Sequence, residues 1–204
     1  MPERKIPDNK NGVPLEHYCA RFAAMRPEDM SFRSGFEYCG GAFKLRYLGG
    51  GVRLTYPDMR LFRPDGAEIS APAARILIGR AVMEGMAKPA NGGFLAYSEV
   101  PWGNVYLQQF RGRCIMRLAF SFGRDPDRFA AACKALGGEP CTGADKAYII
   151  EFITGLYVKL LLWEGDDEFQ PSAQILFSDN FPAMFTAEDM AVAGDLLINA
   201  LKTA

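Results

Sequence analysis

The stretch KAYIIEFITGLYVKLLLW, residues 146–163, consists of two apolar runs separated by Thr154 and Gly155. Glycine readily adopts the positive φ angle of a tight turn, so the stretch predicts paired strands over 146–153 and 156–164. One face of the second strand is apolar and the opposite face is mainly apolar, as in a central strand covered on both sides. These faces carry Leu156, Val158, Leu160 and Leu162 on one side, and Tyr157, Lys159, Leu161 and Trp163 on the other.

Other segments share the alternating pattern of strands. Residues 42–48 and 52–56 flank Gly49-Gly50-Gly51, which predicts a β-hairpin, and residues 173–178 predict a third strand near the C-terminus. Residues 94–104 are aromatic and irregular, and Pro101 argues against a regular central strand there.

Apolar residues at helical spacing predict several helices. The ranges are 14–25, 70–87, 112–122, 126–136 and 187–202. Residues that commonly cap a helix precede three of them. Ser70 comes before the second helix, and Asp125 comes before Pro126. Thr186 and Asp189 resemble a capping box, with aspartate in place of the usual glutamate.

Together these elements predict an α+β fold: a single compact domain over residues 14–204, with helices packed on an antiparallel or mixed sheet. Strands and helices do not alternate as repeated βαβ units, so a doubly wound parallel sheet is not expected. Residues 1–13 are mostly polar and are expected to form a loose N-terminal arm. The expected core includes Ile76, Leu77, Phe129, Leu136, Leu160, Leu162 and Leu197.

Composition favours an ordinary globular protein. The chain has 204 residues, of which 49% are hydrophobic and 23% charged, so it can bury a core without disulfides or a structural metal. A net charge of −1 gives no electrostatic basis for binding nucleic acid or an anionic membrane. No apolar run reaches the ~18 residues of a membrane span, and the polar first residues do not resemble a secretory signal. Five cysteines without such a signal favour the reducing cytoplasm, so we expect a soluble cytoplasmic protein.

The residues that most often carry catalysis form no familiar motif. The cysteines lack the C-x₂-C spacing of zinc and iron–sulfur sites, and Cys19, Cys114 and Cys133 lie on the inner faces of predicted helices. His17 is the only histidine, and no G-x-S-x-G motif is present. The triple glycine is not followed by the G-K-[ST] of a phosphate-binding loop. We therefore predict no metal site among these residues and no cofactor.

Four carboxylates lie within five residues after the second of the paired strands. They are Glu164, Asp166, Asp167 and Glu168. Such a group of oxygen ligands could bind a hard cation, or supply an acid–base pair whose pKa values are split by proximity. The stretch lacks the spacing of a calcium loop, and acidic residues are common in strand connections. We favour a solvated loop and keep the cation site as the alternative.

Aromatic residues offer a second candidate. Tyr97, Trp102 and Tyr106 lie close together in the sequence, and Trp163 ends the buried strand. Such residues line many ligand pockets, but they pack more often in cores and interfaces. We predict core or interface packing and retain an aromatic pocket as the alternative.

Several of these segments resemble a family of uncharacterised bacterial and archaeal proteins, domain of unknown function 3786. The resemblance rests on residues 163–169, 173–178 and 186–189, and also on residues 40–43 and 125–138. The family has no established activity and no assigned catalytic residues. Some relatives carry an additional cysteine-rich iron–sulfur segment and belong to anaerobes with corrinoid and one-carbon metabolism, which implies an accessory role there. This chain lacks that cysteine-rich segment.

These observations favour a non-catalytic binding or accessory protein with a protein partner, and the resemblance adds a link to anaerobic redox or corrinoid metabolism. A small metal-dependent enzyme that uses loop 164–168 is one alternative. A self-associating structural domain, and so a homo-oligomer, is the other. Neither nucleic acid nor a membrane is an expected partner.

Overall fold

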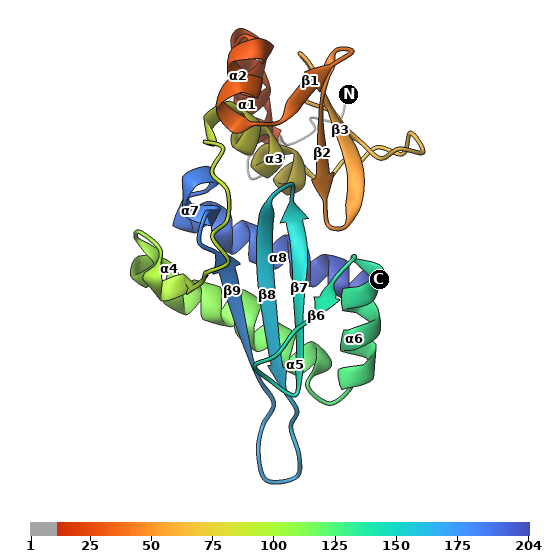
Figure 1. Cartoon of the computed structure of the whole chain (residues 1–204), viewed down its shortest axis with the longest axis vertical. Helices are drawn as coiled ribbons and strands as arrows, with labels where there is room; N and C mark the ends of the chain where they lie inside the picture. The colour runs from red at the N-terminus through yellow and green to blue at the C-terminus, as the bar shows by residue number, and fades with distance from the viewer. Residues whose placement is uncertain (1–11) are drawn as a thin grey trace, which may run out of the picture.

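The computed structural model describes residues 12–204, and within them helices and strands alternate in groups (Figure 1). The helices are α1 (Gly12–Ala24), α2 (Pro27–Ser34), α3 (Pro72–Glu84), α4 (Gly103–Phe110), α5 (Arg117–Phe122), α6 (Pro126–Ala135), α7 (Phe181–Met184) and α8 (Ala187–Thr203). The strands are β1 (Glu37–Cys39), β2 (Ala42–Tyr47), β3 (Gly50–Thr55), β4 (Leu61–Phe62), β5 (Phe94–Ala96), β6 (Glu139–Pro140), β7 (Lys146–Ile153), β8 (Leu156–Trp163) and β9 (Ser172–Ser178).

Within the described residues, nine strands form one sheet in which every pairing is antiparallel. The order along it is β4-β3-β2-β7-β8-β9-β5, with β1 beside β2 and β6 beside β7. The predicted α+β class is therefore confirmed, and the antiparallel alternative is the correct one. One connected cluster of buried apolar side chains runs from Phe22 to Leu201, which makes the chain a single compact domain.

The predicted central strand β8 lies between β7 and β9, with α4, α5 and α8 behind these strands in Figure 1. Its helix-facing residues are fully buried, whereas on the opposite face only Leu161 is buried. The loop at Gly143 approaches Leu161, where a β-carbon on that glycine would lie 3.4 Å from a leucine methyl group. The prediction that both faces are covered is thus wrong for most of the second face, because no helix within residues 12–204 packs there.

The N-terminal strands join this group through a short contact. Tyr47 of β2 pairs with Ile153 of β7, and the amide of Leu48 donates a hydrogen bond to the carbonyl of Phe152 at 3.0 Å. Nearby, Arg46 and Glu151 form an ion pair at 2.9 Å. In Figure 1 strands β1–β3 and helices α1–α3 form the upper half of the molecule, and β7–β9 with α4–α6 form the lower half.

Helix caps agree with the sequence at two ends and differ at one. Asp125 accepts a hydrogen bond from the amide of Arg128 at 3.1 Å, and Thr186 and Asp189 form the expected capping box. Ser70, however, does not cap α3. The N-cap residue of that helix is Ala71, whose side chain makes no capping hydrogen bond. Pro72, one residue further on, already fixes the backbone angle of the first helical position.

The irregular segment that we predicted at 94–104 is more ordered than expected. It contains β5, a 3₁₀ turn at Tyr97–Glu99 and the start of α4. The helix predicted at 112–122 is the second half of a longer helical segment that begins at Gly103. In this segment α4 and α5 are joined by a π-helical turn, Arg111–Met116. Pro101 precedes this helix and does not interrupt it.

Most of the expected core residues are buried. Leu77, Phe129, Leu160, Leu162 and Leu197 are at most 2% exposed. Ile76 and Leu136 are only partly buried, because each lies on the rim of a surface hollow.

Of the expected N-terminal arm, residues 1–11 lie outside the described residues. Gly12 already begins α1, so the arm cannot extend to residue 13 as we had predicted.

We predict that Leu160→Ala or Leu162→Ala lowers the free energy of unfolding by about 2–5 kcal/mol, because each leaves a cavity beneath the helices. Urea unfolding measures the loss. Tyr157→Ala, on the half-exposed face of the same strand, serves as the control and should cost less. A loss below about 1 kcal/mol at both leucines would contradict the buried position of this face.

Candidate functional site

A groove of about 530 Å³ lies where α3, the start of α4 and the α7–α8 segment meet. Arg80 and Glu84 line it from α3, and Trp102 and Tyr106 line it from the start of α4. Residues 182–190, which end α7 and begin α8, form the remaining wall. Three segments that are distant in the sequence therefore build one surface.

Trp102 is held in an uncommon conformation at the mouth of this groove. Its φ angle is 65°, in the left-handed region that costs a non-glycine residue of order 1–3 kcal/mol. The following residue, Gly103, lies so close to the backbone of Tyr97 that a β-carbon would be 1.8 Å from the Tyr97 carbonyl oxygen. The close approach of these two backbones thus fixes the position from which Trp102 extends.

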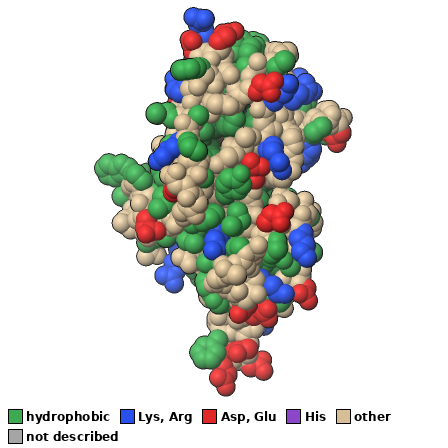
Figure 2. Space-filling model, viewed as in Figure 1, with side chains coloured by type: hydrophobic (Ala, Val, Ile, Leu, Met, Phe, Trp, Pro, Cys, Tyr) green, Lys and Arg blue, Asp and Glu red, His purple; other side chains and the backbone are tan. Residues whose placement is uncertain are grey.

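The indole of Trp102 is directed to solvent and does not enter the core. The residue is 79% exposed, and the neighbouring Val105 and Tyr106 are 62% and 37% exposed. Figure 2 shows hydrophobic side chains projecting from the left edge of the molecule, over α4. An exposed apolar patch beside a groove is a common feature of interaction sites.

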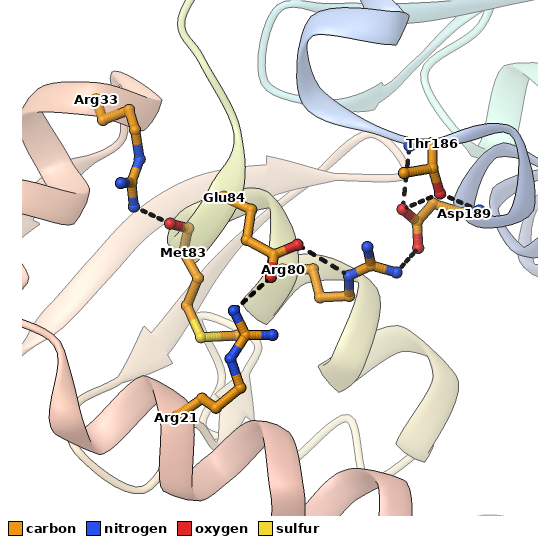
Figure 3. A network of polar contacts seen from close by, with 7 residues as sticks. All are labelled: Arg21, Arg33, Arg80, Met83, Glu84, Thr186 and Asp189. Atoms are coloured by element: carbon orange, nitrogen blue, oxygen red, sulfur yellow. Dashed lines mark hydrogen bonds and ion pairs between the residues drawn. The ribbon is translucent and has the colours of Figure 1, made fainter. Parts of the chain in front are cut away.

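A chain of charged groups forms the polar wall (Figure 3). Arg80 forms an ion pair with Asp189 of α8 and a second one, at 3.3 Å, with Glu84. Glu84 in turn accepts a hydrogen bond from Arg21 of α1, with an ion-pair distance of 2.7 Å. The chain therefore links α1, α3 and α8 through their side chains.

Asp189 has two tasks in this chain. One carboxylate oxygen pairs with Arg80, and the other accepts hydrogen bonds from the amide and hydroxyl of Thr186 at 3.1 and 2.7 Å. The same residue thereby caps α8 and connects it to α3. Figure 3 also shows Arg33 donating to the carbonyl of Met83, which ties α2 to the end of α3.

The pKa shifts in the chain follow from partial burial and from these partners. Burial alone would raise the pKa of Glu84, but the hydrogen bonds and charges of Arg21 and Arg80 outweigh it and lower the pKa. Burial likewise opposes the charged form of Arg80, and the carboxylates of Asp189 and Glu84 reverse the effect and raise its pKa. Glu84 and Arg80 are therefore both charged near neutral pH.

The four aromatic candidates do not form one pocket. Trp102 and Tyr106 line the groove described above, whereas Tyr97 and Trp163 line a second hollow of about 370 Å³ beside β9. Tyr97 is buried, donates its hydroxyl to the Ala187 carbonyl at 2.7 Å, and stacks on Phe110 with 4.0 Å between ring centroids. The sequence identified these four aromatic residues as candidates but did not indicate that two of them line each of two separate hollows.

The acidic candidates lie in the loop between β8 and β9, which begins directly after Trp163 and extends from the lower end of the molecule, away from α4 (Figure 1). All four are exposed. Backbone amides of Phe169 and Glu168 donate to the Asp166 carboxylate at 2.6 and 2.8 Å and lower its pKa. In the part of the chain that the structure describes, no three His, Cys, Asp or Glu side chains converge as metal ligands would.

The cysteines and the histidine contribute little to either hollow. Cys114 and Cys133 are buried as predicted, and burial raises the pKa of the Cys114 thiol to about 12. Cys19 is only half-buried, near Arg75, and its pKa is also raised by burial. His17 lies on the exposed face of α1.

Sequence reasoning missed Arg80 and Glu84 and assigned Asp189 only a capping role. Arg80 and Glu84 are four residues apart on one helix, which is a signal, but such pairs are common on exposed helix faces. Nothing in the sequence indicated that this pair faces the start of α8.

Comparison with known proteins identifies a family for this chain. A family model described as "Domain of unknown function (DUF3786)" matches residues 26–200. The chain belongs to this family. The match includes Arg80, Trp102 and Asp189 and leaves out Arg21, which lies in α1.

No curated protein and no solved structure matches the chain. Among residues 12–204, no helix is both long enough and apolar enough to cross a membrane.

We predict that Asp189→Ala lowers the free energy of unfolding by about 2–4 kcal/mol. It removes the cap of α8, worth about 1 kcal/mol, and leaves the half-buried Arg80 with one carboxylate fewer. Glu188→Ala, at the exposed neighbouring position, is the matched control and should change stability by no more than about 0.5 kcal/mol. Equal losses in the two variants would contradict the role assigned to Asp189.

We predict that neutralising Asp166 and Asp167 to asparagine shifts the melting temperature by less than about 2 °C, because an asparagine oxygen can still accept the two amides and the loop is exposed. Thermal melts with and without Mg²⁺ or Ca²⁺ give the measurement. A metal-dependent rise in the wild type that disappears in the double variant would instead establish a cation site.

Proposed function

We propose that this chain is a non-catalytic binding protein and that its groove between α3, α4 and α8 holds a segment of a partner protein. The observation that carries the proposal is Trp102, a residue that is 79% exposed although its backbone is held in the left-handed region. Exposed tryptophan, tyrosine and arginine side chains are the types that contribute most to protein interfaces. Trp102, Tyr106 and Arg80 lie together in this groove.

Charge indicates which partner chemistry fits. Three carboxylates and one guanidinium line the groove, and that guanidinium, on Arg80, already has two carboxylate partners. Glu188 is exposed and forms no ion pair within residues 12–204. A lysine or arginine of the partner would meet Glu188 while its aliphatic stem and charge contact the Trp102 ring.

The groove's own groups support binding more than catalysis. Neither a histidine nor a cysteine lines it. The Thr186 hydroxyl and the Asp189 carboxylate are used in the helix cap, and Glu84 is used in ion pairs. A nucleophile beside a free base, which covalent catalysis requires, is not among the lining residues. An accessory role in anaerobic redox or corrinoid metabolism stays a prediction.

We expect random peptides selected on the immobilised protein from a display library to be rich in lysine or arginine. Trp102→Ala should weaken the selected peptides at least tenfold, as loss of a central aromatic contact does, and Glu188→Gln should weaken them less. Titration calorimetry measures the affinities. Phe120→Ala, which removes another exposed aromatic ring on α5, is the control and should leave binding unchanged.

Selected peptides without cationic residues would overturn the partner chemistry. Peptides that bind Trp102→Ala as tightly as the wild type would overturn the groove itself. Circular dichroism melts show whether each variant is folded, so a loss of binding is not confused with unfolding.

A further inference from the structure

Strand β9 has an incomplete partner on its outer side. Strand β5 pairs only with residues 176–178 of β9, although β9 begins at Ser172. Strand β5 ends because the Glu99 carboxylate accepts a hydrogen bond from the Ala96 amide at 2.6 Å and the chain turns into a 3₁₀ helix. Within residues 12–204, the segment Ser172–Ile175 therefore has no strand partner on that side.

The unpaired segment lacks the features that usually protect a strand edge. Natural edges commonly carry lysine, proline or a bulge that prevents pairing with another chain. Residues 172–175 read Ser-Ala-Gln-Ile and contain neither a charge nor a proline. Their pairing with β8 on the other side is regular throughout. This edge is therefore competent to accept a further strand.

The second hollow, of about 370 Å³, lies against this edge. Leu107 and Ile115 form part of its helical wall, and Trp163 closes the side toward β8. Arg111, at the start of the π-helical turn, is the only charged residue that lines it, and Arg111 is exposed. A hollow with both apolar and polar walls and one positive charge suits a segment that combines an apolar and an acidic side chain.

The chain itself carries such a segment immediately before β9. The loop that joins β8 to β9 contains Asp166, Asp167 and Glu168, followed by Phe169, which is 69% exposed. Figure 2 shows acidic and hydrophobic side chains together at the lower tip of the molecule. The loop's charge is complementary to that of the hollow.

Antiparallel pairing of two copies would bring these parts together. If residues 172–175 of two molecules pair around a two-fold axis, the residues before Ser172 in one copy are directed toward Leu176 of the other. Strand β5 already occupies the outer side of Leu176, so the chain leaves the plane of the sheet at Pro171. In the second copy that region is flanked by the turn at Ala96–Ser98, which lines the hollow containing Arg111. Each acidic loop would then lie against the partner copy's hollow.

We propose that the chain forms a two-fold symmetric dimer in which residues 172–175 of β9 pair with the same residues of a second copy. Each β8–β9 loop places its acidic residues beside Arg111 of the other copy and its phenylalanine against Leu107 and Ile115 of the hollow. This site is separate from the groove at Trp102, so the dimer and the partner-binding function can fail independently.

Sedimentation velocity over ~1–100 μM protein tests the dimer, and wild-type protein is expected to shift from monomer to dimer within this range. Arg111→Glu should weaken dimerisation at least tenfold, because it places a carboxylate against the acidic loop. Combining Arg111→Glu with Asp167→Lys and Glu168→Lys should restore dimerisation at least in part. Arg53→Glu, at an exposed position on β3, is the control and should have no effect.

A wild type that stays monomeric at every concentration would overturn the proposal. A dimer that Arg111→Glu leaves unchanged, or one that only Trp102→Ala dissociates, would place the interface elsewhere and overturn it as well. Hydrogen exchange gives an independent readout, because the amides of residues 172–175 should be slower to exchange at high protein concentration only in variants that dimerise.

Discussion

The arrangement of the whole molecule depends on the short contact between β2 and β7. Tyr47 and Ile153 are the only residues paired between these strands among those described, yet this pair continues the sheet from its upper to its lower half. The contact is reinforced by packing, since the ring of Tyr47 lies edge-on to Phe152 with 5.6 Å between centroids. Burial of this ring raises the pKa of Tyr47 and keeps its hydroxyl neutral. The N-terminal strands β1–β4 and the later strands β5–β9 therefore form one sheet and contribute to one hydrophobic core.

That shared core sets the distance between α3 and α8, and so creates the groove. The short contact between β2 and β7 joins the two halves of the molecule within the sheet. Away from the sheet, the two halves are connected through side chains. The ion pair between Arg80 and Asp189 provides the connection there, with 20% and 8% of the two side chains exposed. Removing such charges from water is costly, and hydrogen bonds to every available partner offset the cost. Asp189 meets this condition because it also accepts from Thr186.

Local patterns in the sequence predicted the elements well, because their causes are local. Alternation gave β7, β8 and β9, and Asp125 and Thr186 marked the helix starts at which they hydrogen-bond. Features that depend on distant contacts were not predictable in this way. The second face of β8 is partly exposed because no helix among the described residues covers it, although its residues are mostly apolar. Trp102 faces solvent because of a close approach between Gly103 and Tyr97, and periodicity carries no information about such an approach.

The π-helical turn between α4 and α5 has a consequence for how this protein can change. A π turn contains one more residue than the α turn it replaces, so the side chains after it are rotated relative to those before it. Cys114 within the turn and Leu118 after it face the core, and Arg117 after the turn reaches Asp195 of α8. Before it, α4 displays Val105 and Tyr106 to the groove and to solvent. The exposed residues before the turn can therefore be substituted without requiring the buried residues within it and after it to repack.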